Sequence, residues 1–75
     1  MSPDKLVRMA NQIATFFAAQ GEATAPAATA QHLKQFWDPR MRRGIVDHAA
    51  AGGEGLSPVA AKAVELLAAE TKIEG

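Results

Sequence analysis

Eight residues in the middle of the chain divide it into separate helices, and they read Phe36-Trp37-Asp38-Pro39-Arg40-Met41-Arg42-Arg43. A helix cannot continue through Asp38, because the residue before a proline is pushed out of the α region. The same pair suits the start of a helix, since an aspartate side chain caps the first free amides and proline fits the first helical position. We therefore predict that one helix ends at about residue 37 and that the next begins at Pro39.

This opening pair occurs twice more, as Ser2-Pro3 and as Ser57-Pro58, and each occurrence predicts a helix start. Gly21 can end the first helix, and the three glycines within residues 52–55 can adopt the left-handed backbone angles that end the third. The second helix can be capped by Thr24, with a proline in its first turn, or by Thr29, and we favour the earlier start. The predicted helices are 3–20, 25–37, 39–51 and 58–70, with fraying over residues 71–75.

Apolar residues recur at intervals of three and four in all four segments, which is the period of an amphipathic helix, and no stretch alternates as a strand does. The four stripes are Leu6, Met9, Ala10, Ile13, Phe16 and Phe17; His32, Leu33, Phe36 and Trp37; Met41, Ile45, His48 and Ala49; and Val59, Ala60, Ala63, Val64 and Leu67. The short connections between them are typical of a helical bundle. We predict an all-α fold, a small bundle of about four short helices that forms a single domain over residues 1–75.

The composition makes the core of this domain thin. The chain has 75 residues, of which 48% are hydrophobic, and 17 of those are alanine. A domain of this size buries a smaller share of its surface than a larger one and is marginally stable on its own. We therefore expect one apolar face, including Phe36 and Trp37, to be left for a partner.

The charges are balanced overall but unevenly distributed. Eight basic and eight acidic residues cancel, although residues 32–43 carry a local net charge of +3 and residues 44–75 one of −3. This balance argues against a generally cationic nucleic-acid binder and against an acidic tail. No apolar run approaches the roughly 20 residues that span a bilayer, and the N-terminus has no hydrophobic signal segment. We expect a cytoplasmic protein that binds neither nucleic acid nor a membrane.

The sequence offers few groups for catalysis. Cysteine is absent, which excludes a thiolate metal site, and His32 and His48 lack carboxylates at the helical spacing of a metal pair. The two serines, Ser2 and Ser57, are explained by capping, and the glycines of residues 52–55 lack the strand and the Lys-Ser/Thr pair of a phosphate-binding loop. We therefore predict no catalytic, cofactor-binding or metal-ligating residue.

The stretch from Phe36 to Arg43 is instead the predicted partner-binding site. Tryptophan and arginine are enriched at binding hot spots, because each joins a large contact area to directional hydrogen bonds. The alternative is that one aromatic ring fills the core while the arginines are only solvated. Neighbouring helical residues point about 100° apart, so both rings are not expected to enter one small core. The candidate residues are Phe36, Trp37, Asp38, Arg40, Met41, Arg42 and Arg43.

Three stretches together resemble a known family. They are Lys5-Leu6-Val7-Arg8-Met9-Ala10-Asn11-Gln12-Ile13-Ala14, His32-Leu33-Lys34-Gln35-Phe36-Trp37-Asp38-Pro39-Arg40-Met41-Arg42 and Gly52-Gly53-Glu54-Gly55-Leu56-Ser57-Pro58. In order and spacing they are similar to the small delta subunit of cytoplasmic, NAD-dependent, molybdenum-containing formate dehydrogenases. The resemblance covers roughly residues 5 to 67, and the Trp-Asp-Pro-Arg-Met stretch is its most specific part.

This resemblance implies a non-catalytic accessory subunit that binds the large catalytic alpha subunit and supports its assembly or stability. In such complexes the alpha subunit carries bis-molybdopterin guanine dinucleotide, and electrons pass through iron-sulfur clusters to FMN and NAD on other subunits. The resemblance therefore implies no cofactor on this chain. The alternative from the residues alone is a free-standing helical regulator or nucleic-acid adaptor, for which DNA binding with a steep salt dependence would be evidence.

Overall fold

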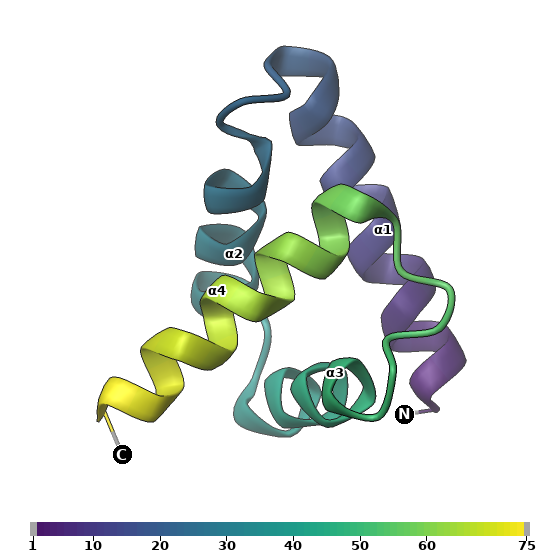
Figure 1. The fold of residues 1–75 in the computed structure, drawn as a ribbon, viewed down its shortest axis with the longest axis vertical. Helices are drawn as coiled ribbons and strands as arrows, with labels where there is room; N and C mark the ends of the chain where they lie inside the picture. The colour runs from purple at the N-terminus through teal and green to yellow at the C-terminus, as the bar shows by residue number, and fades with distance from the viewer. Residues whose placement is uncertain (1, 75) are drawn as a thin grey trace.

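The fold consists of four helices joined by short turns (Figure 1). The computed structural model describes the backbone of residues 2–74 and the side chains of residues 2–70. The helices are α1 (Pro3–Gln20), α2 (Ala25–Phe36), α3 (Pro39–Ala50) and α4 (Pro58–Glu74). No strand occurs within residues 2–74, and the predicted all-α fold is confirmed.

The helix boundaries lie close to the predicted ones, with one exception. α1 has the predicted bounds, and α2 and α3 each end one residue earlier than expected. The prediction that α4 ends at residue 70 is wrong, because the helix continues to Glu74. Residues 71–74 contain neither glycine nor proline, so nothing in this stretch interrupts the backbone hydrogen bonds. The predicted fraying of Gly75 lies outside the described residues.

Three of the four predicted side-chain caps are present. Ser2, Asp38 and Ser57 each accept a hydrogen bond from the amide three residues further on, at 3.4, 2.9 and 3.2 Å. Thr24 precedes α2 as predicted, but its side chain does not cap the helix. Its hydroxyl instead donates to the carbonyl oxygen of Gly21 at 3.3 Å, and this bond closes the turn between α1 and α2.

The turn between α3 and α4 is fixed by glycines and by a side chain of α1. Gly52, Gly53 and Gly55 all have positive φ, as predicted. The side-chain Nδ2 of Asn11 donates a hydrogen bond to the carbonyl oxygen of Gly55 at 2.9 Å. The side-chain Oδ1 of Asn11 accepts one from the backbone amide of Ser57, also at 2.9 Å. One side chain in the middle of α1 therefore holds the start of α4 in place.

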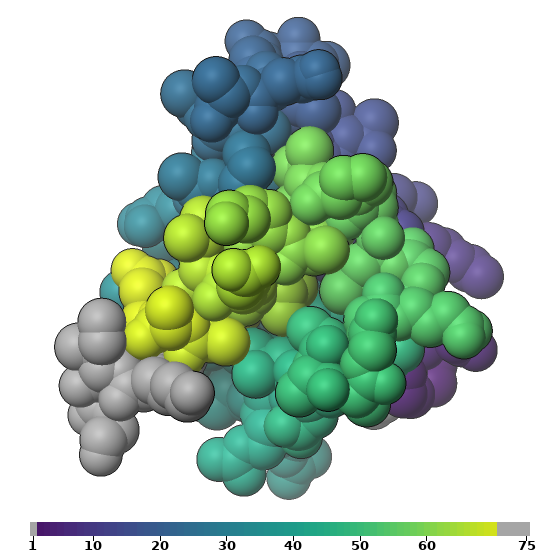
Figure 2. Space-filling model, viewed as in Figure 1, coloured from purple at the N-terminus to yellow at the C-terminus, as the bar shows by residue number. Residues whose placement is uncertain are grey.

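The helices enclose a core beneath α4. α1 and α2 run in opposite directions and diverge from the turn that joins them, α3 lies across their open end, and α4 crosses in front (Figure 1). In the space-filling view α4 covers the centre of this face, between α2 above and α3 below (Figure 2). α4 packs more extensively on α2 than on any other helix.

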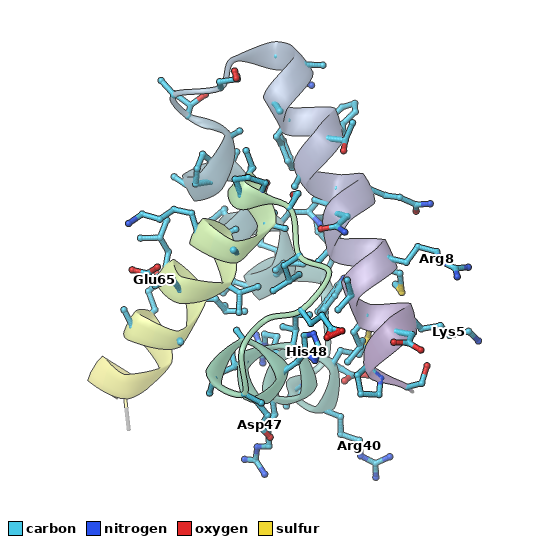
Figure 3. The ribbon with its side chains drawn as sticks, turned by 45° about the vertical axis from the view of Figure 1, so that its right-hand side comes forward. Lys5, Arg8, Arg40, Asp47, His48 and Glu65 are labelled. Carbon is cyan, nitrogen blue, oxygen red and sulfur yellow. The ribbon has the colours of Figure 1, made fainter. Side chains whose placement is uncertain are left out.

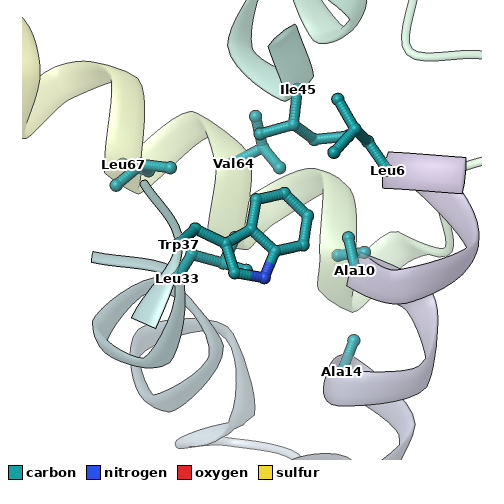
Figure 4. Close-up of a cluster of buried hydrophobic side chains, with 9 residues drawn as sticks. Leu6, Ala10, Ala14, Leu33, Trp37, Ile45, Val64 and Leu67 are labelled. Atoms are coloured by element: carbon teal, nitrogen blue, oxygen red, sulfur yellow. The ribbon is translucent and has the colours of Figure 1, made fainter. Parts of the chain in front are cut away.

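Small residues set the distances between the helices. Half of the twelve buried hydrophobic residues among the described side chains are alanine. α3 approaches α1 at Gly44, where an added Cβ would lie 2.7 Å from Cδ1 of Leu6. The buried side chains that form one contiguous cluster are Leu6, Ala10, Ala14, Leu33, Trp37, Ile45, Ala60, Val64 and Leu67 (Figure 4).

The predicted stripes reach this core to different extents. α4 buries the centre of its stripe, from Ala60 to Leu67, as its spacing indicates. α1 buries Leu6, Ala10 and Ala14, whereas Phe16 is 60% exposed. Because the helices meet through alanine, the line of closest approach lies along the small residues, and the large ring of Phe16 falls on the flank of α1.

The hydroxyl of Thr29 provides a test of the core. Thr29 is fully buried in α2, and its Oγ1 has no hydrogen-bond partner among the described residues. Replacing it with the isosteric valine removes the cost of desolvating this hydroxyl, so T29V should raise the free energy of unfolding by about 1 kcal/mol. The gain is measurable as a melting temperature raised by about 4–8 °C. The control is T15V, which removes an exposed hydroxyl that donates to the Asn11 carbonyl oxygen and should bring no gain.

Candidate docking surface

The two neighbouring aromatic residues of the predicted site lie in opposite environments. Phe36 is 70% exposed, whereas Trp37 is 6% exposed and belongs to the core cluster. The indole ring lies at the centre of that cluster, among side chains from α1, α2, α3 and α4 (Figure 4). The prediction that only one ring enters the core is confirmed. The ring of Trp37 fills the space between the helices, and the expectation that Trp37 contacts a partner stays a prediction.

Two polar members of the predicted site are used within the chain. Oδ1 of Asp38 accepts a hydrogen bond from the backbone amide of Met41 at 2.9 Å. Nη1 of Arg42 donates to the carbonyl oxygen of Lys34 at 2.9 Å. That carbonyl lies in the last turn of α2, where backbone acceptors have no partner within the helix. Asp38 and Arg42 therefore fix the turn between α2 and α3.

The remaining members of the predicted site lie along α3. Arg40 and Arg43 are exposed, and the side chain of Arg40 points away from the molecule (Figure 3). Met41 is half-buried and packs against the core. The structure thus leaves Phe36, Arg40 and Arg43 at the surface, and their binding role stays a prediction.

Phe36 belongs to a continuous row of rings that we call the aromatic face, formed by Phe16 and Phe17 of α1 and His32 and Phe36 of α2. The ring centroids of Phe36 and His32 are 4.7 Å apart, those of His32 and Phe17 6.0 Å, and those of Phe17 and Phe16 5.2 Å. The two phenylalanines of α1 meet edge to face at 76°, a favoured arrangement for aromatic pairs. The antiparallel packing of α1 and α2 brings these rings together.

Sequence reasoning missed the aromatic face as a unit. It placed Phe16 and Phe17 on an apolar stripe of α1 and His32 and Phe36 on a stripe of α2. A usable signal was present, because both stripes carry rings in addition to the alanines and leucine that fill a thin core. The contact across the two helices depends on their packing, which the local pattern does not specify.

The two histidines have structural surroundings. Nε2 of His48 lies 2.8 Å from the carbonyl oxygen of Glu54, within the turn between α3 and α4. Nδ1 of His32 is buried and has no hydrogen-bond partner among the described residues. Among the described residues no group of three or more His, Cys, Asp or Glu side chains is arranged to hold a metal ion.

A groove of about 370 Å³ lies where the end of α2 meets α3 and α4. Its lining carries charges of both signs, from the cations Arg42 and Arg43 and from the anions Asp47 and Glu70. Lys34 also lines it and forms an ion pair with Glu70 at 3.7 Å. Three cations and two anions leave the lining with a net charge of only +1, so the groove does not present a strong field of one sign.

The fold and its surface define a small all-α protein whose most prominent exposed feature is an apolar surface of rings. None of the described helices has the length and apolar character needed to cross a membrane. The family model of the NADH-dependent formate dehydrogenase delta subunit (FdsD) matches residues 5–64. The chain therefore belongs to this delta subunit family, as its sequence resemblance indicated. No curated protein and no solved structure matches it.

Proposed function

We propose that this chain is an accessory subunit that binds the large catalytic subunit of an NADH-dependent formate dehydrogenase and supports its assembly or stability. The observation that carries the proposal is the family match over residues 5–64. A partner that binds only the folded, assembled state stabilises that state by RT ln(1 + [L]/Kd), where [L] is the free concentration of the partner, so even a small chain can act in this way.

The chemistry of the residues agrees with a supporting role. The sequence contains no cysteine and so supplies no thiolate ligand for an iron-sulfur cluster. In our proposal bis-molybdopterin guanine dinucleotide, the clusters, FMN and NAD are held by other subunits. The contribution of this chain is then a surface, for which Phe36 is the most exposed large hydrophobic residue among the described side chains.

The proposal is tested by producing the formate dehydrogenase complex with and without this chain, using a tag on the large subunit. We expect the chain to co-purify at a fixed molar ratio. Complex made without it should show a lower melting temperature of the large subunit or a lower molybdenum content. A tagged large subunit that never retains the chain, and whose melting temperature and molybdenum content do not change, would refute the proposal.

A further inference from the structure

We infer that the aromatic face, rather than the arginines of α3, carries the docking, and that its occupant is an apolar surface without charged side chains on the large subunit. This inference rests on the proposed function and names the surface and the chemistry of its partner. Four features of the molecule support it: the exposure of the rings, their packing, the charges around them, and the area they offer.

The exposed rings of the aromatic face form one connected patch, unlike single phenylalanines scattered over a surface. Phe16 and Phe36 are 60% and 70% exposed, and Phe17 and His32 connect them through ring contacts. Scattered exposed apolar residues are ordinary on a protein surface, but a contiguous patch marks an interaction site. Each ring is held by its neighbour, so little side-chain freedom is lost when a partner covers them.

The stretch of chain that carries the rings contains few charged residues, although the exposed Asp38 and Arg40 follow shortly after Phe36. The sequence has sixteen charged residues, and only Glu22 and Lys34 fall within residues 9–37, the stretch that forms most of α1 and all of α2. Lys34 is directed toward α4, where it pairs with Glu70, and Glu22 lies in the turn between the two helices. The labelled cations of α1, Lys5 and Arg8, lie on its N-terminal half (Figure 3). Interface cores are depleted of charge and enriched in aromatic residues in the same way.

The arginines of α3 are less suited to form the centre of an interface. Arg42 is already bound to the carbonyl oxygen of Lys34. Arg40 and Arg43 are exposed, and charged side chains in such positions act mainly on association rate and contribute little affinity. A surface that matches the aromatic face should be mainly apolar, because a carboxylate set against these rings would lose its hydration without compensation, and a cation would recover only part of its hydration through the rings.

The area of the rings fits the core of a standard interface. At 60% and 70% exposure, Phe16 and Phe36 together offer roughly 260 Å². A stable complex buries about 800 Å² on each partner, of which a small central cluster carries most of the affinity. The two rings supply about a third of that area, and uncharged side chains of α1 and α2 can supply the rest.

The test compares variants of the full chain for binding to formate dehydrogenase purified without it. F16A/F36A should weaken binding by about 100-fold or more, since two hot-spot rings are removed. Q12K, which places a charge one helical turn from Phe16, should also weaken binding by at least about 10-fold. The matched control is L66S, which removes an apolar side chain of α4 that is 36% exposed. The R40Q/R43Q variant tests the arginines. Both variants should bind with an affinity within about threefold of the wild type. Circular dichroism of each variant verifies that it is folded.

The outcomes separate this inference from the proposed function. If the wild-type chain does not bind the large subunit at all, the proposed function fails. If it binds and F16A/F36A binds equally well, the function stands and the aromatic face is refuted as its site. A large loss in R40Q/R43Q together with strong weakening by salt would show charged docking and overturn the inference. Self-association of the chain that F16A/F36A abolishes, with binding to the large subunit intact, would overturn it in favour of a second copy.

Discussion

Replacing Trp37 with alanine should remove a large part of the free energy of unfolding, whereas the same change at the adjacent Phe36 should leave the fold almost unaffected. Trp37 is 6% exposed and contributes the largest side chain of the core cluster. Removing a buried tryptophan costs about 3–5 kcal/mol. A domain of this size is stable by only about 4–11 kcal/mol in total, at the usual value per residue. The W37A variant therefore loses a large part of its stability.

The two variants form a matched pair, since they remove neighbouring aromatic side chains from the same end of α2. Chemical denaturation followed by circular dichroism measures both. F36A should lower the free energy of unfolding by less than about 1 kcal/mol, because the ring is mostly in water already. Equal losses in W37A and F36A would contradict the placement of Trp37 in the core.

Replacing Asn11 with alanine is the second change with a large expected effect. Its side chain makes two hydrogen bonds at 2.9 Å to a turn more than forty residues away, one to the carbonyl oxygen of Gly55 and one from the amide of Ser57. N11A leaves both backbone groups without these partners, and the Ser57 amide is partly buried. The partly buried Ser57 amide costs about 1–3 kcal/mol when unpaired, the exposed Gly55 carbonyl costs less because water replaces its partner, and alanine returns about 0.5 kcal/mol through its helix propensity. We expect a net loss of about 2 kcal/mol.

The control for Asn11 is its neighbour Gln12, which also carries a side-chain amide but is exposed. Q12A should be neutral or slightly stabilising, since it gains helix propensity and loses no tertiary bond. Hydrogen exchange gives a second readout, because N11A should increase exchange at the Ser57 amide more than in the centre of α2. Uniform acceleration across all helices would mean that Asn11 acts on global stability alone and does not hold the turn locally.

The parts of the fold that depend on adjacent residues could be predicted from the sequence. Ser2, Asp38 and Ser57 cap helices through atoms three residues away, and a proline follows each of them, so local chemistry suffices. The positive φ angles of the glycine-rich turn are predictable for the same reason. The end of α4 lies beyond the predicted one because residues 71–74 contain neither glycine nor proline, so no local signal ends the helix before Glu74.

The parts that depend on distant residues could not be predicted in the same way. Helical geometry indicates that either Phe36 or Trp37 enters the core, but only the positions of α1, α3 and α4 decide which. Asn11 has poor helix propensity in the middle of α1, which hints at a tertiary role, yet its partners follow α3. Likewise, the aromatic face exists only because α1 and α2 are antiparallel with Phe17 opposite His32.

The burial of Trp37 also allows folding and docking to be followed by separate fluorescence signals. The chain has one tryptophan and no tyrosine, so its intrinsic fluorescence comes almost entirely from a single ring in the core. The aromatic face consists of phenylalanine and histidine, which contribute almost nothing to that emission. Unfolding should therefore shift the emission to longer wavelength, while docking through the aromatic face should leave the emission of this ring unchanged. One built-in fluorophore can thus show that the chain stays folded while a separate label records its binding.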